Sequence, residues 1–123
     1  MAQNPYTKGR KGEDIAVHTL VARGYKILER NWRGRAGEVD VIAKKGRTLV
    51  FVEVKARASS RYGNPKEAVH PEKQRRISMV ALEYLKSTGH SKAGARFDVV
   101  AIRTDTQPPE VEVVENAFEL AYR

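Results

Sequence analysis

The chain has 123 residues, no cysteine, and 23 Lys and Arg residues against 15 Asp and Glu residues, which gives a formal net charge of +8. This length suits one domain with its own core, so residues 1–123 are expected to form a single domain. The lack of cysteine excludes disulfides, thiolate zinc sites and a cysteine nucleophile, and the basic excess favours a polyanionic partner.

Residues 1–14 are polar and charged, without the apolar stretch of a secretion signal, and no apolar run reaches membrane-spanning length. We therefore expect a soluble, cytoplasmic protein that does not bind a membrane. Basic residues gather in loops and at element ends, where they can reach a phosphate backbone. The candidates for nucleic-acid contact are Arg10, Lys11, Arg33, Arg35, Arg57, Arg61, Tyr62, Lys73 and Gln74. The alternative is a generally basic protein without such a partner.

Residues 7–23 predict the first helix, with Thr7 as its N-cap and Gly24 as its stop. Glu13 extends the apolar stripe of this helix toward the sheet, where a carboxylate needs a charged partner or a metal ion. Alternatively, the stripe leaves the core at this end of the helix and Glu13 is solvated. Residues 25–32 predict an edge strand, and a basic loop follows.

Residues 37–57 predict a β-hairpin, because two alternating runs flank a turn at Gly46 and Arg47. Alternation gives the first strand two faces, with Val39, Val41 and Ala43 on one and Glu38, Asp40 and Ile42 on the other. The register that this turn imposes places Lys45 opposite Thr48, Asp40 opposite Glu53, and Glu38 opposite Lys55.

Two carboxylates at cross-strand distance repel each other, so Asp40 and Glu53 need an opposite charge beside them. A divalent cation supplies it, because Mg²⁺ binds one or two carboxylates, keeps several waters and leaves room for phosphate oxygens. Lys55 then adds a fixed positive charge next to the pair. The structural alternative is a solvated face on which the acids pair with Lys55 and Arg57.

Residues 58–71 lack apolar periodicity and predict a mobile loop beside the charged face. A second helix starts at Pro71, and the cations in its first turn favour a phosphate site there. Residues 95–103 predict a strand, which a helical crossover places parallel to the second hairpin strand. The chain returns as an edge strand over residues 110–114, and residues 117–122 predict a helical turn.

Several separated motifs agree in order and spacing with one family: G-E-D at 12–14, G-Y at 24–25, N-W at 31–32, G-E-V-D at 37–40, F-V-E-V-K at 51–55 and R-F-D-V-V at 96–100. Together they resemble the bacterial YraN family of the PD-(D/E)xK nuclease superfamily, which includes restriction endonucleases and archaeal Holliday junction resolvases. The resemblance covers nearly the whole chain. It implies one nuclease-like α/β domain, with a restriction endonuclease-like three-layer α/β/α core, a mixed central sheet of about five strands and the order αβββαββ.

The resemblance also implies roles for individual residues. Asp40 and Glu53 would bind Mg²⁺ or Mn²⁺, the carbonyl of Val54 would add a ligand, and Glu13 would assist the metal. Lys55 would orient the attacking water or stabilise developing charge. By this resemblance the four side chains of Asp40, Glu53, Lys55 and Glu13 would correspond to the catalytic residues of the active nucleases in the superfamily.

The sequence departs from the superfamily's name at one position, because Val39 stands where a proline precedes the aspartate. The resemblance implies an endonuclease that binds and cleaves DNA, with branched or structured DNA as the expected form. Junction-cutting members of the superfamily act as dimers, so a homodimer is one of the assemblies that the resemblance allows. Two alternatives keep the same fold without catalysis: a nucleic-acid-binding module, and an interaction subunit of a DNA-processing complex.

Overall fold

The computed structural model describes residues 8–58, 69–90 and 94–119. Within them the order of elements is α1 (Lys8–Ala22), β1 (Lys26–Arg33), β2 (Glu38–Lys45), β3 (Thr48–Arg57), α2 (Pro71–Ser87), β4 (Gly94–Arg103) and β5 (Glu110–Phe118). The predicted αβββαββ order of an α/β fold is confirmed. Thr7, the predicted N-cap of the first helix, lies outside the described residues.

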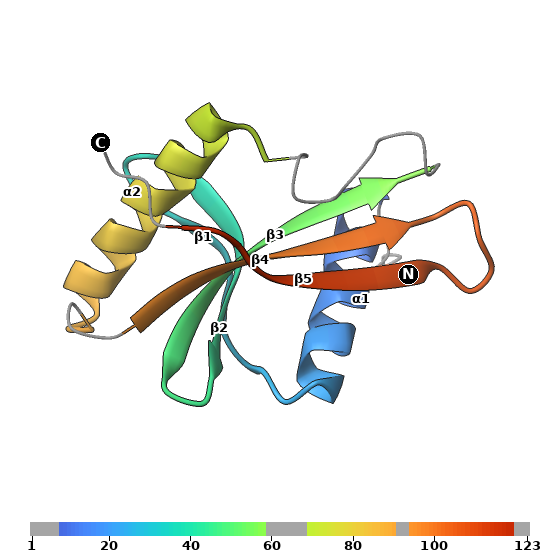
Figure 1. Cartoon of the computed structure of the whole chain (residues 1–123), viewed down its shortest axis with the longest axis horizontal. Helices are drawn as coiled ribbons and strands as arrows, with labels where there is room; N and C mark the ends of the chain where they lie inside the picture. The colour runs from blue at the N-terminus through green and yellow to red at the C-terminus, as the bar shows by residue number, and fades with distance from the viewer. Residues whose placement is uncertain (1–7, 59–68, 91–93, 120–123) are drawn as a thin grey trace, which may run out of the picture.

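The strands form one mixed sheet in the order β1-β2-β3-β4-β5, and the two helices lie on opposite sides of it (Figure 1). β3 and β4 are parallel and are joined through α2, whereas the other neighbouring strands are antiparallel. The predictions of a parallel crossover and of two edge strands, the first and the last, are therefore confirmed.

Each helix covers its own hydrophobic cluster. On the α2 side, Phe51 and Phe97 of the sheet pack against the apolar face of α2. The rings of Phe51 and Tyr84 meet edge-on, with 6.0 Å between their centroids. On the α1 side, Leu20 packs on the small aliphatic residues of the central strands, which include Val50 and Val52. Burial of both sheet faces explains the aliphatic runs of β3 and β4.

The hairpin register is confirmed near the turn, where Lys45 pairs with Thr48 and Gly46 has φ +61°. The face prediction is wrong at Val39, which packs with Ile42 on the α2 side and not with Val41. The ladder between β2 and β3 ends at the pair Val41 and Val52. Strict alternation applies only where the ladder is regular, and β2 departs from β3 beyond this pair.

β5 is longer than predicted. It continues through Phe118, whose ring stacks on Phe97 at 4.7 Å between centroids. The predicted helical turn is therefore wrong at residues 117 and 118, while residues 120–122 lie outside the described part of the chain. The apolar pair at the end of the strand extends the sheet because Phe97 offers it a buried partner.

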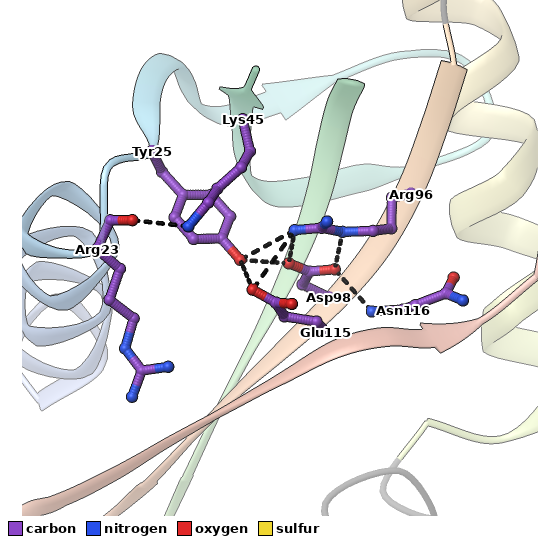
Figure 2. Close-up of polar contacts among 7 residues, drawn as sticks. All are labelled: Arg23, Tyr25, Lys45, Arg96, Asp98, Glu115 and Asn116. Atoms are coloured by element: carbon purple, nitrogen blue, oxygen red, sulfur yellow. Dashed lines mark hydrogen bonds and ion pairs between the residues drawn. The ribbon is translucent and has the colours of Figure 1, made fainter. Parts of the chain in front are cut away.

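Asp98 is fully buried and ties three segments together (Figure 2). Its carboxylate accepts two hydrogen bonds from the Arg96 guanidinium, both at 2.9 Å. It also accepts one from the Tyr25 hydroxyl at 2.7 Å and one from the backbone amide of Asn116 at 2.9 Å. Lys45 lies over the Tyr25 ring with its ammonium 4.5 Å from the ring centroid. These contacts satisfy a carboxylate that would otherwise be costly to bury, and they join β4, β5 and the turn that leads from α1 into β1.

Candidate functional site

Asp40 lies where β2 separates from β3. Its Oδ2 atom accepts a hydrogen bond of 2.8 Å from the backbone amide of Val54. Burial and the nearby charge of Glu53 raise the pKa of Asp40 from its ordinary 3.8 to about 6, although the Val54 amide opposes this rise. The site therefore holds a carboxylate whose ionised form is disfavoured by its surroundings.

Glu53 stands on β3 with the same orientation as Phe51 and is buried on the α2 side of the sheet. Its Oε1 atom lies 2.6 Å from the ammonium of Lys73 and 3.6 Å from that of Lys55. Two ammonium groups from different elements thus meet at one carboxylate oxygen. The repulsion between Asp40 and Glu53 is offset here by lysines, so that repulsion alone does not require a metal ion.

The two lysines respond to this contact in opposite ways. Burial and the neighbouring Lys73 lower the pKa of Lys55. Burial is the largest single influence on Lys73 and acts to lower its pKa. The hydrogen bonds with Glu53 and Lys55 and the charges of Glu53 and Asp40 together outweigh burial, so the pKa of Lys73 is raised. Lys73 is therefore the ammonium most firmly held by Glu53, and Lys55 is the amine more easily deprotonated.

Glu13 projects from α1 toward β1. Its Oε2 atom accepts a hydrogen bond of 3.1 Å from the side chain of Asn31, whereas its Oε1 atom is buried without a hydrogen-bond partner among the described residues. The guanidinium of Arg30 lies 3.9 Å from that oxygen. The negative charge of Glu13 also raises the pKa of Asp40, although burial and Glu53 contribute more to the rise. The sequence predicted that this acid needs a partner or a metal ion. One of its oxygens has such a partner in Asn31, and the other has no hydrogen bond among the described residues.

Sequence reasoning missed Asn31 and the true contact of Lys73. Asn31 adopts φ +52°, a conformation that asparagine tolerates better than most residues, and its amide bridges Glu13 and Glu38. Lys73 was expected to face phosphate from the helix terminus, yet its ammonium contacts Glu53. The sequence signal at Asn31 was the N-W pair at residues 31–32, which ends the strand predicted over residues 25–32.

The predicted ladder pair of Asp40 with Glu53 does not form, because the ladder ends at Val41 and Val52, and the predicted pairing of Glu38 with Lys55 is wrong as well. The hairpin ladder stops before reaching either residue, and Glu38 instead bonds to Asn31 at 3.4 Å and to Arg33 at 3.3 Å. Lys55 contacts Glu53, its neighbour on the same face of β3. The separation of β2 from β3 turns Glu38 toward the edge strand.

Among the described residues, no group of three or more His, Cys, Asp or Glu side chains is already arranged to hold a metal ion. The donor atoms nevertheless fit a hard cation in kind, because Asp40, Glu53 and Glu13 offer carboxylate oxygens and one Glu13 oxygen is buried without a hydrogen bond. By the family resemblance, Asp40, Glu53 and the carbonyl of Val54 would be the ligands, with Glu13 assisting. Glu53 would first have to give up its contact with Lys73.

The basic loop after β1 is held against α2. The amide of Gly34 bonds to the carbonyl of Gly37 at 2.8 Å, and the amide of Arg35 donates to Glu83 Oε1 at 2.7 Å. Gly37 has φ +149° and lies against the side chain of Arg76. Arg33, the last residue of the edge strand β1, has 79% of its side chain exposed.

The other predicted nucleic-acid contacts are placed as follows. Gln74 donates its side-chain amide to the carbonyl of Val69 at 2.9 Å, which secures the start of α2. Arg57 closes β3, and its carbonyl accepts the amide of Thr104 at 2.8 Å. The remaining candidates have side chains outside the described part of the structure: Arg10, Lys11, Arg61 and Tyr62.

A family model described as "Uncharacterised protein family UPF0102" matches residues 12–102. The chain belongs to the UPF0102 family. The matched segment begins within α1 and runs nearly to the end of β4, and so contains every acid and lysine of the site. The family-level resemblance of the sequence motifs is thereby confirmed.

Relatives in the UPF0102 family align over nearly their whole length. A UPF0102 protein of Geobacter metallireducens is 53% identical over 114 residues, covering 93% of each chain. One of Syntrophus aciditrophicus is 49% identical over 122 residues, covering 99% of this chain and 95% of the relative. One of Rhodococcus opacus is 50% identical over 111 residues, covering 89% of this chain and 94% of the relative.

In the described segments, neither helix is long and apolar enough to cross a membrane.

Proposed function

We propose that this UPF0102 protein is a Mg²⁺- or Mn²⁺-dependent endonuclease of the PD-(D/E)xK superfamily, acting on DNA. The observation that carries the proposal is the convergence of Asp40, Glu53 and Lys55 where β2 separates from β3. Asp40 is linked to the Val54 amide at 2.8 Å, and Lys55 lies 3.6 Å from Glu53. These residues are the ones to which the sequence resemblance assigns catalysis.

The energetic character of the site supports this assignment. Burial and the charge of Glu53 raise the pKa of Asp40 to about 6, so the ionised carboxylate destabilises the fold at neutral pH. Groups that are unfavourable for folding are concentrated at functional sites. An asparagine at this position would avoid the cost and still accept the hydrogen bond from the Val54 amide.

The chain's residues suggest a division of roles in phosphodiester hydrolysis. Water attacks phosphorus, the bond to the 3′ oxygen breaks, and the products carry a 3′-hydroxyl and a 5′-phosphate. When bound, Mg²⁺ or Mn²⁺ supplies charge that neutralises the phosphate and acidifies water. Asp40 is fixed by the Val54 amide, and Lys55, whose pKa burial lowers, is placed to orient the attacking water or take up its proton.

The basic charge of the chain supports DNA as the substrate. The formal charge is +8, Arg33 ends β1, and the loop that follows with Arg35 is tied to α2 by Glu83. A fixed basic loop at the edge of the sheet can bind a backbone phosphate with little loss of conformational entropy. Branched or structured DNA remains the proposed form, and a homodimer the proposed assembly, by resemblance to junction-cutting nucleases.

One observation favours a second candidate function. Lys55 and Lys73 already neutralise Glu53, so the acids can persist as a structural ion-pair network in a protein that binds DNA without cleaving it. This alternative predicts salt-sensitive DNA binding that does not depend on divalent metal or on Lys55.

The two functions separate in one experiment. Labelled four-way junctions, flaps, single strands and duplexes are incubated with the protein and Mn²⁺, with Asp40→Asn as the matched variant. The nuclease proposal predicts cleavage of at least one form by wild type and none by Asp40→Asn, with DNA binding retained by both. If all four forms stay intact with wild type, or are cut equally by both proteins, the nuclease proposal fails.

A further inference from the structure

Glu53 already has a cation in contact with it. The ammonium of Lys73, from the first turn of α2, lies 2.6 Å from Glu53 Oε1, which is a short charge-assisted contact. Lys55 lies farther from the same oxygen, at 3.6 Å. Lys73 is therefore the dominant partner of the carboxylate to which metal binding is assigned.

Lys73 also acts on the rest of the acidic cluster. Its positive charge lowers the pKa of Asp40 and so partly offsets the effects of burial and Glu53. One ammonium thus serves both acids, as a divalent ion between them would. The side chain of Lys73 is 26% exposed, so part of this flexible side chain already contacts solvent.

We propose that Lys73 is a tethered counter-ion that competes with the divalent cation for Glu53, so that metal binding displaces the Lys73 ammonium. The inference rests on the proposed metal site and adds a residue that nothing in the family resemblance assigns. Glu53 Oε1 is held at hydrogen-bond distance by Lys73, and an ammonium and a divalent cation cannot share that position because they repel each other strongly at such separations.

Competition has a definite consequence for affinity. In wild type, binding of the cation includes the loss of the contact between Lys73 and Glu53. A variant that lacks the ammonium has no such contact to lose, so it binds the cation more tightly, even though its metal-free fold is less stable. A lysine that merely stabilised the ligand in its binding geometry would have the opposite effect.

The test measures Mn²⁺ binding by isothermal titration calorimetry, without DNA and without any activity assay. Lys73→Met keeps most of the stem, and we expect it to bind Mn²⁺ about tenfold more tightly than wild type, which corresponds to about 1.4 kcal/mol. Lys73→Gln is a second variant and should show the same direction. Lys73→Arg keeps the charge and should bind within about twofold of wild type.

Arg75→Met is the matched control, because it removes one positive charge from an exposed position of the same helix. If Lys73→Met and Arg75→Met tighten binding equally, the effect is general electrostatics and the competition is refuted. Unchanged or weaker binding by both Lys73→Met and Lys73→Gln also refutes it. If wild type binds no Mn²⁺ and Glu53→Gln behaves identically to it, the metal site of the proposed function fails as well, which distinguishes the two failures.

Discussion

Replacing Asp40 by Asn should stabilise the fold at alkaline pH while abolishing the proposed activity. Asn keeps an oxygen that can accept the Val54 amide, which lies 2.8 Å from Asp40 Oδ2, but it carries no charge. The substitution therefore removes what is unfavourable about Asp40, namely burial of an anion close to Glu53, and leaves the local geometry in place.

The magnitude follows from the pKa of Asp40. A rise from 3.8 to about 6 is roughly 2.2 units, and at about 1.36 kcal/mol per unit the ionised carboxylate costs about 3 kcal/mol. Asn makes a weaker hydrogen bond than a carboxylate, which offsets about 1 kcal/mol. The net gain at pH 8 is about 2 kcal/mol, or about 8 °C in melting temperature for a domain of this size.

The sign of the pH dependence is fixed by the same shift. Because the folded-state pKa of Asp40 is raised, its favourable contribution is fully present below pH 3.8 and is lost as pH rises through about 6. The stability gain of Asp40→Asn should therefore be large at pH 8 and small at pH 4.5, where the wild-type carboxyl is protonated in the folded protein.

Urea denaturation at both pH values in EDTA measures this difference. Glu38→Gln is the control, since Glu38 is an exposed acid two residues away on the same strand, and it should change stability by less than about 0.5 kcal/mol. If Asp40→Asn is no more stable than wild type at pH 8, or gains equally at pH 4.5 and pH 8, the argument that Asp40 is held at a cost is wrong.

Three further predictions concern the hydrogen bonds around Asp98, the turn at Gly37, and the arginines at the end of β1 and in the loop after it. Asp98→Ala should lower the free energy of unfolding by about 3 to 5 kcal/mol in urea denaturation, because it removes the buried partner of Arg96. Gly37→Ala should lower it by about 1 to 3 kcal/mol in the same assay, because a Cβ is strained at φ +149°. Replacing Arg33 and Arg35 together by Ala should reduce the slope of log affinity against log salt by about 1.8, in fluorescence anisotropy with labelled DNA.

Each of these has a matched control. Glu112→Ala removes an exposed acid from β5 and should be nearly neutral beside Asp98→Ala. Gly94→Ala meets no atom within 4 Å, so it should be tolerated where Gly37→Ala is not. Lys86→Ala, at the exposed end of α2, should leave DNA binding unchanged. Equal effects of a variant and its control would contradict the corresponding prediction.

The order of elements and the hairpin register were predictable because they depend on local chemistry. The turn at Gly46 sets the pairing of Lys45 with Thr48, and a period of two then determines which residues of the regular ladder share a face. The face of Val39 was mispredicted, because alternation in the sequence does not show where β2 separates from β3. Beyond that separation the Asp40 side chain accepts a hydrogen bond from the Val54 amide in place of regular ladder pairing.

The site was predictable in part. Asp40, Glu53 and Lys55 lie close in sequence, and one hairpin brings them together. Lys73 belongs to a helix whose position over the sheet depends on packing of the whole core, so its contact with Glu53 has no local sequence signal. The end of β5 was mispredicted for a similar reason, since an apolar Ala-Phe pair suits helix or strand equally until Phe97 provides a partner.

Asp98 also constrains when the protein can complete folding. The hydroxyl that bonds to it comes from Tyr25, 73 residues earlier in the sequence, and the amide comes from Asn116, near the carboxyl end. During synthesis the central strands emerge before β5 can supply that amide. Pairing of this buried acid is therefore complete only when β5 lies beside β4, so the hydrogen bonding of the interior and the closing of the sheet edge depend on each other.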